Sequence, residues 1–178
     1  MDINVMDEIT ELEKRVGGLS NTQKILLATD GSVTRILDVV EGEVDINTLT
    51  QEFQEADKYL SQKLNISEGD NVNYRVVVIG TDEPLIYAIS HIPVDRLTNN
   101  FKEDLIRANI PIGRILKKHN VESRREIESV GVEKPDEELK KIFKTDAMML
   151  TRTYNIIRNN EILIRIKETF PITSFNEN

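Results

Sequence analysis

The stretch VNYRVVVIGTDEPLIYAISHIP, residues 72–93, carries the strongest fold signal in the chain. Two runs rich in β-branched and aromatic residues, 72–79 and 85–92, stand on either side of the Gly80–Pro84 turn. That arrangement predicts an antiparallel β-hairpin. Pro93 ends the second strand because it has no backbone N–H to offer a neighbouring strand.

Runs of the same kind occur on both sides of this hairpin. Residues 33–40 are rich in β-branched side chains, and residues 44–49 alternate apolar and polar side chains after a Gly42 turn, which predicts a second hairpin. A third hairpin is predicted near the C-terminus. The full set of predicted strands is 33–40, 44–49, 72–79, 85–92, 123–132, 148–157 and 161–170. Apolar spacing and helix-start signals predict helices at 7–16, 22–29, 55–64, 99–108, 110–118 and 135–143.

Successive hairpins with helices inserted between them favour an α+β fold. We expect a single antiparallel β-sheet built from hairpins, with helices packed on it, in place of the βαβ alternation of a parallel sheet. The length of 178 residues fits one domain. We therefore expect residues 1–178 to form a single domain, with an N-terminal helical segment at about 1–20.

Composition limits the partners and the location. The net charge of −8 disfavours binding to nucleic acid or to anionic membranes, both of which need a positive field. No apolar run approaches the ~20 residues of a membrane helix, the acidic N-terminus lacks signal-peptide features, and cysteine is absent. We expect a cytoplasmic protein with a small-molecule partner and with neither a nucleic-acid nor a membrane partner. The sequence does not indicate an oligomeric state.

Several classes of chemistry have no motif in this chain. It contains no G-x-G-x-x-G, no P-loop, no H-E-x-x-H and no G-x-S-x-G sequence. Its two histidines, His91 and His119, share no ligand spacing, and thiolate ligands are excluded because there is no cysteine. We expect neither a metal nor a cofactor, and the remaining chemistry is acid–base or electrostatic, through Arg, Lys, Asp and Glu.

Two charged residues within predicted strands are the main candidates for a functional site. Arg75 either lies on the wet face of its strand or points into a pocket, where its guanidinium could grip a carboxylate. Glu168 shares its strand parity with apolar residues, namely Ile164, Ile166 and Phe170. A carboxylate on that face is costly unless it is paired or functional. The alternative for Glu168 is an ion-paired or edge-exposed side chain at a strand end.

Two shorter segments are weaker candidates. The sequence Pro111-Ile112-Gly113-Arg114 is a candidate anion site at a helix start, where backbone N–H groups have no partner within the helix. The alternative is an ordinary junction between a loop and a helix. The turn that contains Ser32, Val33 and Thr34 is typical of a simple turn or cap when it is taken alone.

At these same places the sequence resembles the chorismate pyruvate-lyase family, especially its archaeal and mycobacterial branch. The matching stretches occur in family order and run from about residue 20 to 175. They are LLATDGSVTRIL (26–37), YRVVVIGTDEPLIYAISHIPVDRL (74–97), IPIGRIL (110–116), SRREI (123–127) and IKETFP (166–171). The resemblance implies an antiparallel sheet with a small aromatic acid buried under helical flaps.

The resemblance also implies a set of site residues. Arg75 matches the strand arginine that binds the product carboxylate, and Glu168 matches the glutamate that contacts the ring hydroxyl. Ile112, before Gly113, matches the position whose backbone N–H helps to bind the carboxylate. Val33, followed by Thr34, matches a methionine whose backbone lines the site. The valine leaves that backbone role intact, but it removes any contact through a thioether.

The implied reaction converts chorismate into 4-hydroxybenzoate and pyruvate without a cofactor, and it needs a second cation for the enolpyruvyl carboxylate. Arg114 and Arg125 are candidates for that cation, and each could equally be a surface charge. Glu168 would accept a hydrogen bond from the 4-hydroxyl or act as a base toward C4.

Two alternatives remain. The same fold resembles the effector-binding domain of some bacterial transcription regulators, which binds a small acid without catalysis. Those regulators carry an N-terminal DNA-binding domain, whereas only about 20 residues precede the matched region here. The chain could also have kept the fold and lost the chemistry.

Overall fold

The computed structural model describes residues 2–107 and 110–177. Its helices are α1 (Val5–Val16), α2 (Asn21–Ala28), α3 (Val33–Val40), α4 (Lys58–Leu64), α5 (Asn99–Arg107), α6 (Ile112–Lys118) and α7 (Glu137–Phe143), with a short 3-10 turn at Val94–Arg96. Its strands are β1 (Asp45–Glu55), β2 (Asn71–Gly80), β3 (Pro84–Pro93), β4 (Arg124–Glu133), β5 (Met149–Arg158) and β6 (Glu161–Pro171).

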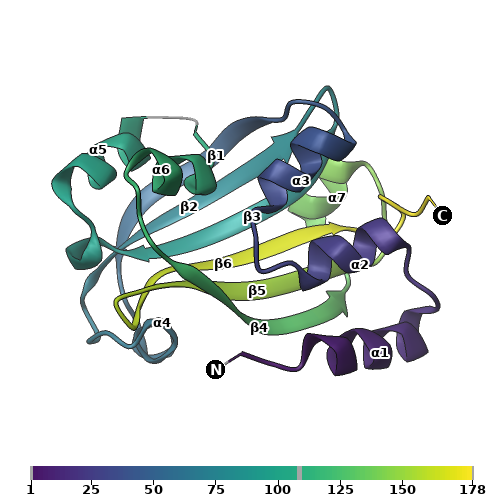
Figure 1. The fold of residues 1–178 in the computed structure, drawn as a ribbon, viewed down its shortest axis with the longest axis horizontal. Helices are drawn as coiled ribbons and strands as arrows, with labels where there is room; N and C mark the ends of the chain where they lie inside the picture. The colour runs from purple at the N-terminus through teal and green to yellow at the C-terminus, as the bar shows by residue number, and fades with distance from the viewer. Residues whose placement is uncertain (1, 108–109, 178) are drawn as a thin grey trace.

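All six strands of the described chain form one antiparallel sheet, in the order β1-β2-β3-β6-β5-β4. The hairpin β2–β3 and the C-terminal hairpin β5–β6 lie where the sequence predicts them. The two hairpins meet along β3 and β6, in the middle of the sheet. The α+β fold with a single antiparallel sheet is therefore confirmed (Figure 1).

The prediction of a strand at residues 33–40 is wrong, because this segment forms α3. Ser32 caps the helix by accepting a hydrogen bond from the Arg35 N–H. Val33 and Leu37, four residues apart, are buried, whereas Val39 is 83% exposed. This spacing is helical, and burial of one helix face outweighs the preference of β-branched residues for strands. The described chain accordingly has six strands and not the seven predicted.

The other boundaries differ from the prediction by small amounts. Strand β1 continues to Glu55, so the helix predicted from residue 55 begins at Lys58 after the Asp57 cap. Helix α6 begins at Ile112, because Pro111 serves as its N-cap residue. The predicted helix 99–108 appears as α5, Asn99–Arg107, and residue 108 lies outside the described residues.

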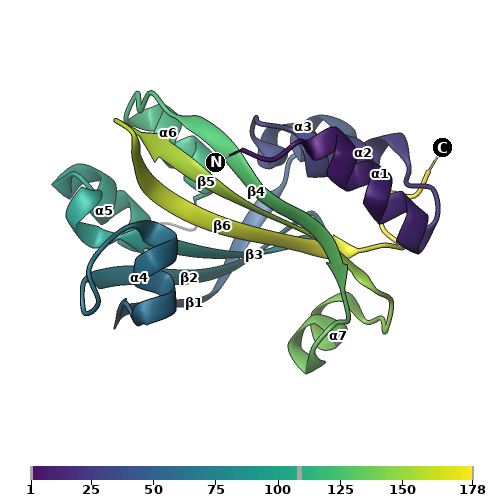
Figure 2. The same ribbon diagram turned by 90° about the horizontal axis from the view of Figure 1, so that it is seen from below.

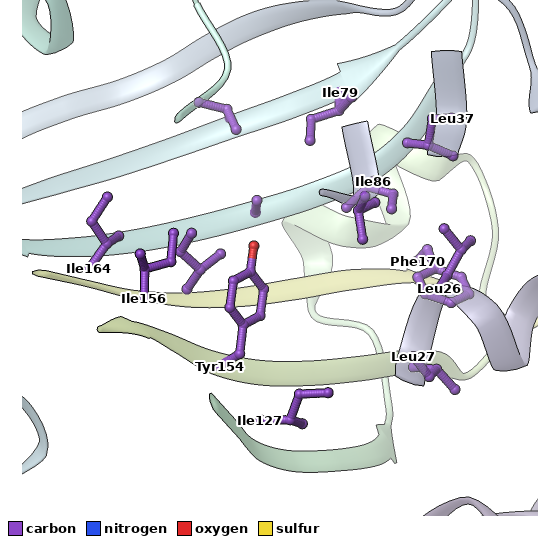
Figure 3. Packing of buried hydrophobic residues seen from close by; sticks show 14 of the residues in the cluster. Leu26, Leu27, Leu37, Ile79, Ile86, Ile127, Tyr154, Ile156, Ile164 and Phe170 are labelled. Carbon is purple, nitrogen blue, oxygen red and sulfur yellow. The ribbon is translucent and has the colours of Figure 1, made fainter. Parts of the chain in front are cut away.

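The main core lies between one face of the sheet and helices α1, α2, α3, α5 and α6. Leucines of α2 and α3 pack there against isoleucines and Phe170 of the sheet (Figure 3). On the opposite face, α4 packs on Val72 and α7 packs on Met149, as separate small clusters (Figure 2). In residues 2–107 and 110–177, no helix is long and apolar enough to cross a membrane.

Candidate active site

A buried cavity lies between the sheet and the starts of α3 and α6. We call it the inner cavity. It has a volume of about 40 Å³, and its floor is formed by side chains of all six strands. Its cover consists of Ser32, Val33 and Thr34 on one side and Pro111, Ile112 and Gly113 on the other. The floor is mostly apolar, so its few charged side chains are prominent.

Arg75 enters the inner cavity from β2. It lies on the same face of the strand as Val77 and Ile79, which line the same cavity. Its side chain is only 1% exposed. Its Nη2 donates to the carbonyl oxygen of Ile110 at 3.0 Å, just before α6. Burial lowers the pKa of Arg75 to about 10, which still leaves the guanidinium charged at neutral pH. A buried cation of this kind favours an anionic ligand.

Glu168 enters the same cavity from β6 and is 5% exposed. Arg152, its direct cross-strand partner on β5, donates from Nε to Glu168 Oε2 at 2.8 Å. The hydroxyl of Tyr154, also on β5, donates to Glu168 Oε1 at 2.9 Å. Each carboxylate oxygen therefore receives one hydrogen bond. These bonds hold the carboxylate in place, and its remaining lone pairs can accept from a ligand.

Tyr154 and Arg152 support Glu168 in different ways. Burial, and then the charge of Glu168, raises the pKa of Tyr154, so its hydroxyl stays protonated and acts as a donor. Burial alone would lower the pKa of Arg152, but the charge of Glu168, together with the contacts that Arg152 makes to Glu168 and Tyr154, outweighs burial and the pKa is raised. Arg152 Nη1 also donates to the Thr29 carbonyl oxygen at 2.6 Å. Arg152 thus connects the site carboxylate to the segment that leads into α3.

Gly113 allows the cover of the cavity to close tightly. A Cβ atom at this position would lie 3.3 Å from Ser32 Oγ and 3.9 Å from Arg125 Nη2. The first of these distances is tighter than most real Cβ contacts, so a larger residue would require Ser32 or the start of α6 to shift by a few tenths of an ångström. The glycine therefore has a packing reason in addition to any role of its backbone N–H.

The two candidates for a second cation occupy different places. Arg125, on β4, lines the inner cavity, and its guanidinium carbon lies 6.0 Å from the centre of the Tyr154 ring. Its Nε is buried and has no hydrogen-bond partner among residues 2–107 and 110–177. Arg114 does not line the inner cavity, and it forms an ion pair with Asp38 at 3.3 Å on the outer side of the cover.

The structure brings together most of the residues that the sequence singled out. Seven of the eight predicted positions line the inner cavity, and Arg114 is the exception. They are Arg75, Glu168, Ile112, Gly113, Val33, Thr34 and Arg125. Within the described chain, no group of three or more His, Asp or Glu side chains could hold a metal ion.

Arg152 and Tyr154 were missed by the sequence reasoning, although a signal was present. In β5 they share a parity with Leu150 and Ile156, so they are polar residues on an apolar face, as Glu168 is in β6. The register of the β5–β6 hairpin then places Arg152 opposite Glu168. Extending the parity argument from one strand to its hairpin partner would have found both residues.

A family model matches residues 27–176, which is most of the chain. Its description is "Chorismate pyruvate-lyase Rv2949c-like". The chain belongs to this Rv2949c-like lyase family. The segment before residue 27, which contains α1, lies outside the match.

A relative found by sequence similarity supports the same assignment. The protein named "Putative lyase MJ0807", from Methanocaldococcus jannaschii, is 40% identical over 176 residues. The alignment covers 94% of this chain and 87% of that protein. Membership of the Rv2949c-like family therefore supports a lyase, while the individual substrate is left to proposal.

Solved structures share the fold at low sequence identity. PhnF from Mycobacterium smegmatis has a TM-score of 0.70 at 13% identity, covering 85% of this chain and 67% of that one. The effector domain of PhnF has a TM-score of 0.67 at 14% identity, covering 79% and 88%. The ligand-binding domain of a GntR-family regulator from Bordetella bronchiseptica has a TM-score of 0.63 at 14% identity, covering 77% and 88%. At such identities these likenesses show the fold alone.

Proposed function

We propose that the protein is a chorismate pyruvate-lyase that converts chorismate into 4-hydroxybenzoate and pyruvate. The observation that carries the proposal is a buried arginine and a buried, doubly hydrogen-bonded carboxylate in one apolar cavity. Arg75 and Glu168 lie on β2 and β6, which are separated by β3 and so are two strand spacings or about 10 Å apart, and the register offsets the two residues by two positions along the strands. This pair suits a ring that bears a carboxylate at one end and a hydroxyl at the other.

The proposed reaction needs no net redox change and no added cofactor. The C3–O bond of chorismate breaks, the ring loses its C4 proton and becomes aromatic, and the released enolpyruvyl group gains a proton at its methylene carbon to become pyruvate. Protons therefore balance between the two products. In this scheme Arg75 binds the ring carboxylate, assisted by the backbone N–H of Ile112.

Glu168 is assigned to the 4-hydroxyl. Both of its oxygens accept hydrogen bonds, from Arg152 and Tyr154, which hold the carboxylate in one orientation with lone pairs left to accept from a ligand hydroxyl. On this geometry we assign Glu168 the acceptor role toward the hydroxyl. Arg125 is assigned to the enolpyruvyl carboxylate, because it lines the inner cavity and Arg114 does not.

The size of the inner cavity implies a closed state. A volume of about 40 Å³ holds a few water molecules at ~10–15 Å³ each, whereas pockets for small ligands span ~300–1,000 Å³. The start of α3 and the start of α6 cover the cavity, so we propose that they separate to admit the substrate. A closed cavity also excludes water and strengthens the electrostatic contacts of the bound acid.

A direct assay tests the proposal. Purified protein is incubated with chorismate without added cofactor, and the products are separated by chromatography with ultraviolet detection. We expect 4-hydroxybenzoate and pyruvate in equal amounts, in proportion to the enzyme concentration. Chorismate that decays only at its spontaneous rate would refute the lyase activity.

The fold of the effector domains supports a second candidate, a domain that binds a small acid without catalysis. That function predicts binding of 4-hydroxybenzoate, seen as a rise in the melting temperature, together with intact chorismate in the assay above. The inner cavity would serve both functions, and turnover is the property that separates them.

A further inference from the structure

A second, larger cavity adjoins the inner cavity on the outer side of its cover. We call it the outer cavity. It has a volume of about 490 Å³ and is lined by residues of α3, α6, β4 and the segment that joins α6 to β4. It shares four lining residues with the inner cavity, namely Ser32, Thr34, Gly113 and Arg125. The two cavities therefore meet at the boundary that Arg125 occupies.

The charge of the outer cavity is opposite to that of the whole chain. Its lining contains four basic side chains, which are Arg35, Arg114, Lys117 and Arg125, and one acidic side chain, Asp38, so its formal charge is +3. The chain as a whole carries −8. A concave surface with one sign of charge concentrates counter-ions of the other sign. This surface is therefore suited to attract an anion that the rest of the molecule repels.

The rest of the lining indicates what kind of anion fits. Hydroxyl groups come from Ser32, Thr34 and Ser123, and the apolar side chains are limited to Leu116 and Val121. Among residues 2–107 and 110–177, no aromatic side chain lines the outer cavity, whereas Tyr154 and several isoleucines line the inner one. The inner cavity suits a ring, and the outer cavity suits a small, hydrophilic carboxylate.

We propose that the outer cavity binds the pyruvate product and forms the path by which it leaves, so that pyruvate is released before the aromatic product. This inference rests on the proposed lyase function. Arg125 holds the enolpyruvyl carboxylate at the boundary, and cleavage of the C3–O bond frees that half. The basic lining then receives the short 2-oxo acid, while 4-hydroxybenzoate stays between Arg75 and Glu168.

The order of release gives a kinetic signature. The product that leaves last can rebind to the free enzyme, which is also the form that binds chorismate. We therefore expect 4-hydroxybenzoate to inhibit competitively against chorismate. Pyruvate binds a different form and is expected to inhibit non-competitively. Its inhibition should weaken as salt rises, because salt screens charges that are open to solvent.

The closing experiment compares two neighbouring lysines of α6 in the full chain. Lys117 lines the outer cavity, whereas Lys118 does not and pairs with Asp104 at 2.9 Å. Lys117→Gln should weaken pyruvate inhibition by roughly twofold to fivefold, the effect of one exposed charge contact. It should leave inhibition by 4-hydroxybenzoate unchanged. Lys118→Gln, with the same loss of charge, should leave both unchanged.

Three outcomes would overturn the proposal: equal pyruvate inhibition in Lys117→Gln and wild type, competitive inhibition by pyruvate, or weakened inhibition by 4-hydroxybenzoate in Lys117→Gln. Saturation-transfer NMR with pyruvate, run on the same proteins saturated with 4-hydroxybenzoate and without chorismate, measures the binding to this form without turnover. If wild type fails to cleave chorismate yet binds pyruvate in a Lys117-dependent way, the lyase function fails and the anion site remains. If it cleaves chorismate and pyruvate does not bind, the outer site fails alone.

Discussion

At the residue scale, a few charged side chains lie in and beside the mostly apolar inner cavity, where the burial of charge is costly. Arg75 and Arg152 are each 1% exposed, and Glu168 lies between Arg152 and the cavity. Arg152 is compensated within the protein by Glu168. Arg75 lines the inner cavity and donates to the carbonyl oxygen of Ile110. We assign the ring carboxylate to this guanidinium, so Arg75 is the position where loss of the side chain should cost most in binding.

Arg75→Ala should lower kcat/KM for chorismate, because it should raise the activation free energy by roughly 2–4 kcal/mol, the scale of removing one partner of a buried charged contact. That corresponds to about 30-fold to 1,000-fold. Steady-state kinetics measures it. Arg107→Ala is the control, because Arg107 is exposed on α5 and its ion pair with Glu103, at 4.0 Å, lies on the surface. Wild-type kcat/KM in Arg75→Ala would contradict the assignment.

Glu168→Gln should keep the fold and lose most of the turnover. Glutamine has the same size, but it cannot provide the anionic acceptor that we assign to the ring hydroxyl. Tyr154→Phe removes one donor to Glu168 and should lower kcat less than Glu168→Gln does, with a rise in activation free energy of about 1–3 kcal/mol. The rates of both variants are compared with Glu161→Gln, an exposed position at the start of β6. A larger loss in Tyr154→Phe than in Glu168→Gln would show that tyrosine acts other than through the glutamate.

At the scale of elements, α3 shows how a helix can arise from strand-forming residues. Its apolar side chains at Val33, Ile36, Leu37 and Val40 follow helical spacing, and Ser32 provides the cap. Leu37→Ala should lower the free energy of unfolding by about 2–5 kcal/mol, because it opens a space in the core. Val39→Ala, at an exposed position, should be neutral or slightly stabilising, because alanine favours helices. Urea denaturation measures both, and a marked loss in Val39→Ala would argue for a strand.

A second element-scale feature is the ion network that joins α4 to β4 and β6. Glu128, at a β-bulge of β4, accepts from Lys63 at 2.6 Å and from Arg165 at 2.5 Å. Burial raises the pKa of Glu128, but the two cations together lower it below the usual value. The network should therefore stabilise the fold above the ordinary carboxylate pKa and lose that effect as pH falls through the lowered pKa.

Glu128→Gln should lower the free energy of unfolding by about 1 kcal/mol at pH 7, because a partly buried network contributes a little more than a typical surface pair. The difference from wild type should shrink as pH falls below about 4. Urea denaturation at several pH values measures this. Glu137→Gln is the control, because that carboxylate is 93% exposed and its ion pair with Lys140 lies on the surface. If the difference in the free energy of unfolding between wild type and Glu128→Gln grows as the pH falls, the expected direction of the pH dependence is wrong.

At the scale of the whole molecule, one core connects the N-terminal helices with both hairpins. Ile9 and Leu12 of α1 belong to the same cluster as Phe170 of β6. The Gln23 side chain also donates to the carbonyl oxygens of Ile172 and Ser174, which ties α2 to the C-terminal segment. We propose on this basis that the chain folds as one domain that includes the N-terminal helical segment.

One domain predicts one cooperative transition. Thermal unfolding followed by far- and near-ultraviolet circular dichroism should give the same midpoint, and 4-hydroxybenzoate should raise that midpoint as its concentration increases. Arg75→Ala should lose most of the rise caused by the ligand. Two separate transitions would show that the N-terminal helices unfold on their own.

The sequence by itself determined the antiparallel sheet and most of the candidate site. Strand alternation and turn residues act over a few neighbours, so the hairpins at 72–93 and 148–170 and the buried parity of Glu168 could be predicted locally. The segments at 33–34 and 112–113 were weaker candidates when taken alone, and the resemblance to a known family strengthened them. These predictions depend on short-range patterns, and they agree with the elements observed.

Only the tertiary structure decided the state of residues 33–40 and the place of each cation. Helix α3 exists because its apolar face finds a core made by distant strands, and that gain exceeds a local preference of a few tenths of a kcal/mol. Arg125 and Arg114 are eleven positions apart, yet one lines the inner cavity and the other pairs with Asp38 outside it. Which side of a packed layer a charge occupies depends on the whole arrangement of layers, and no local pattern encodes it.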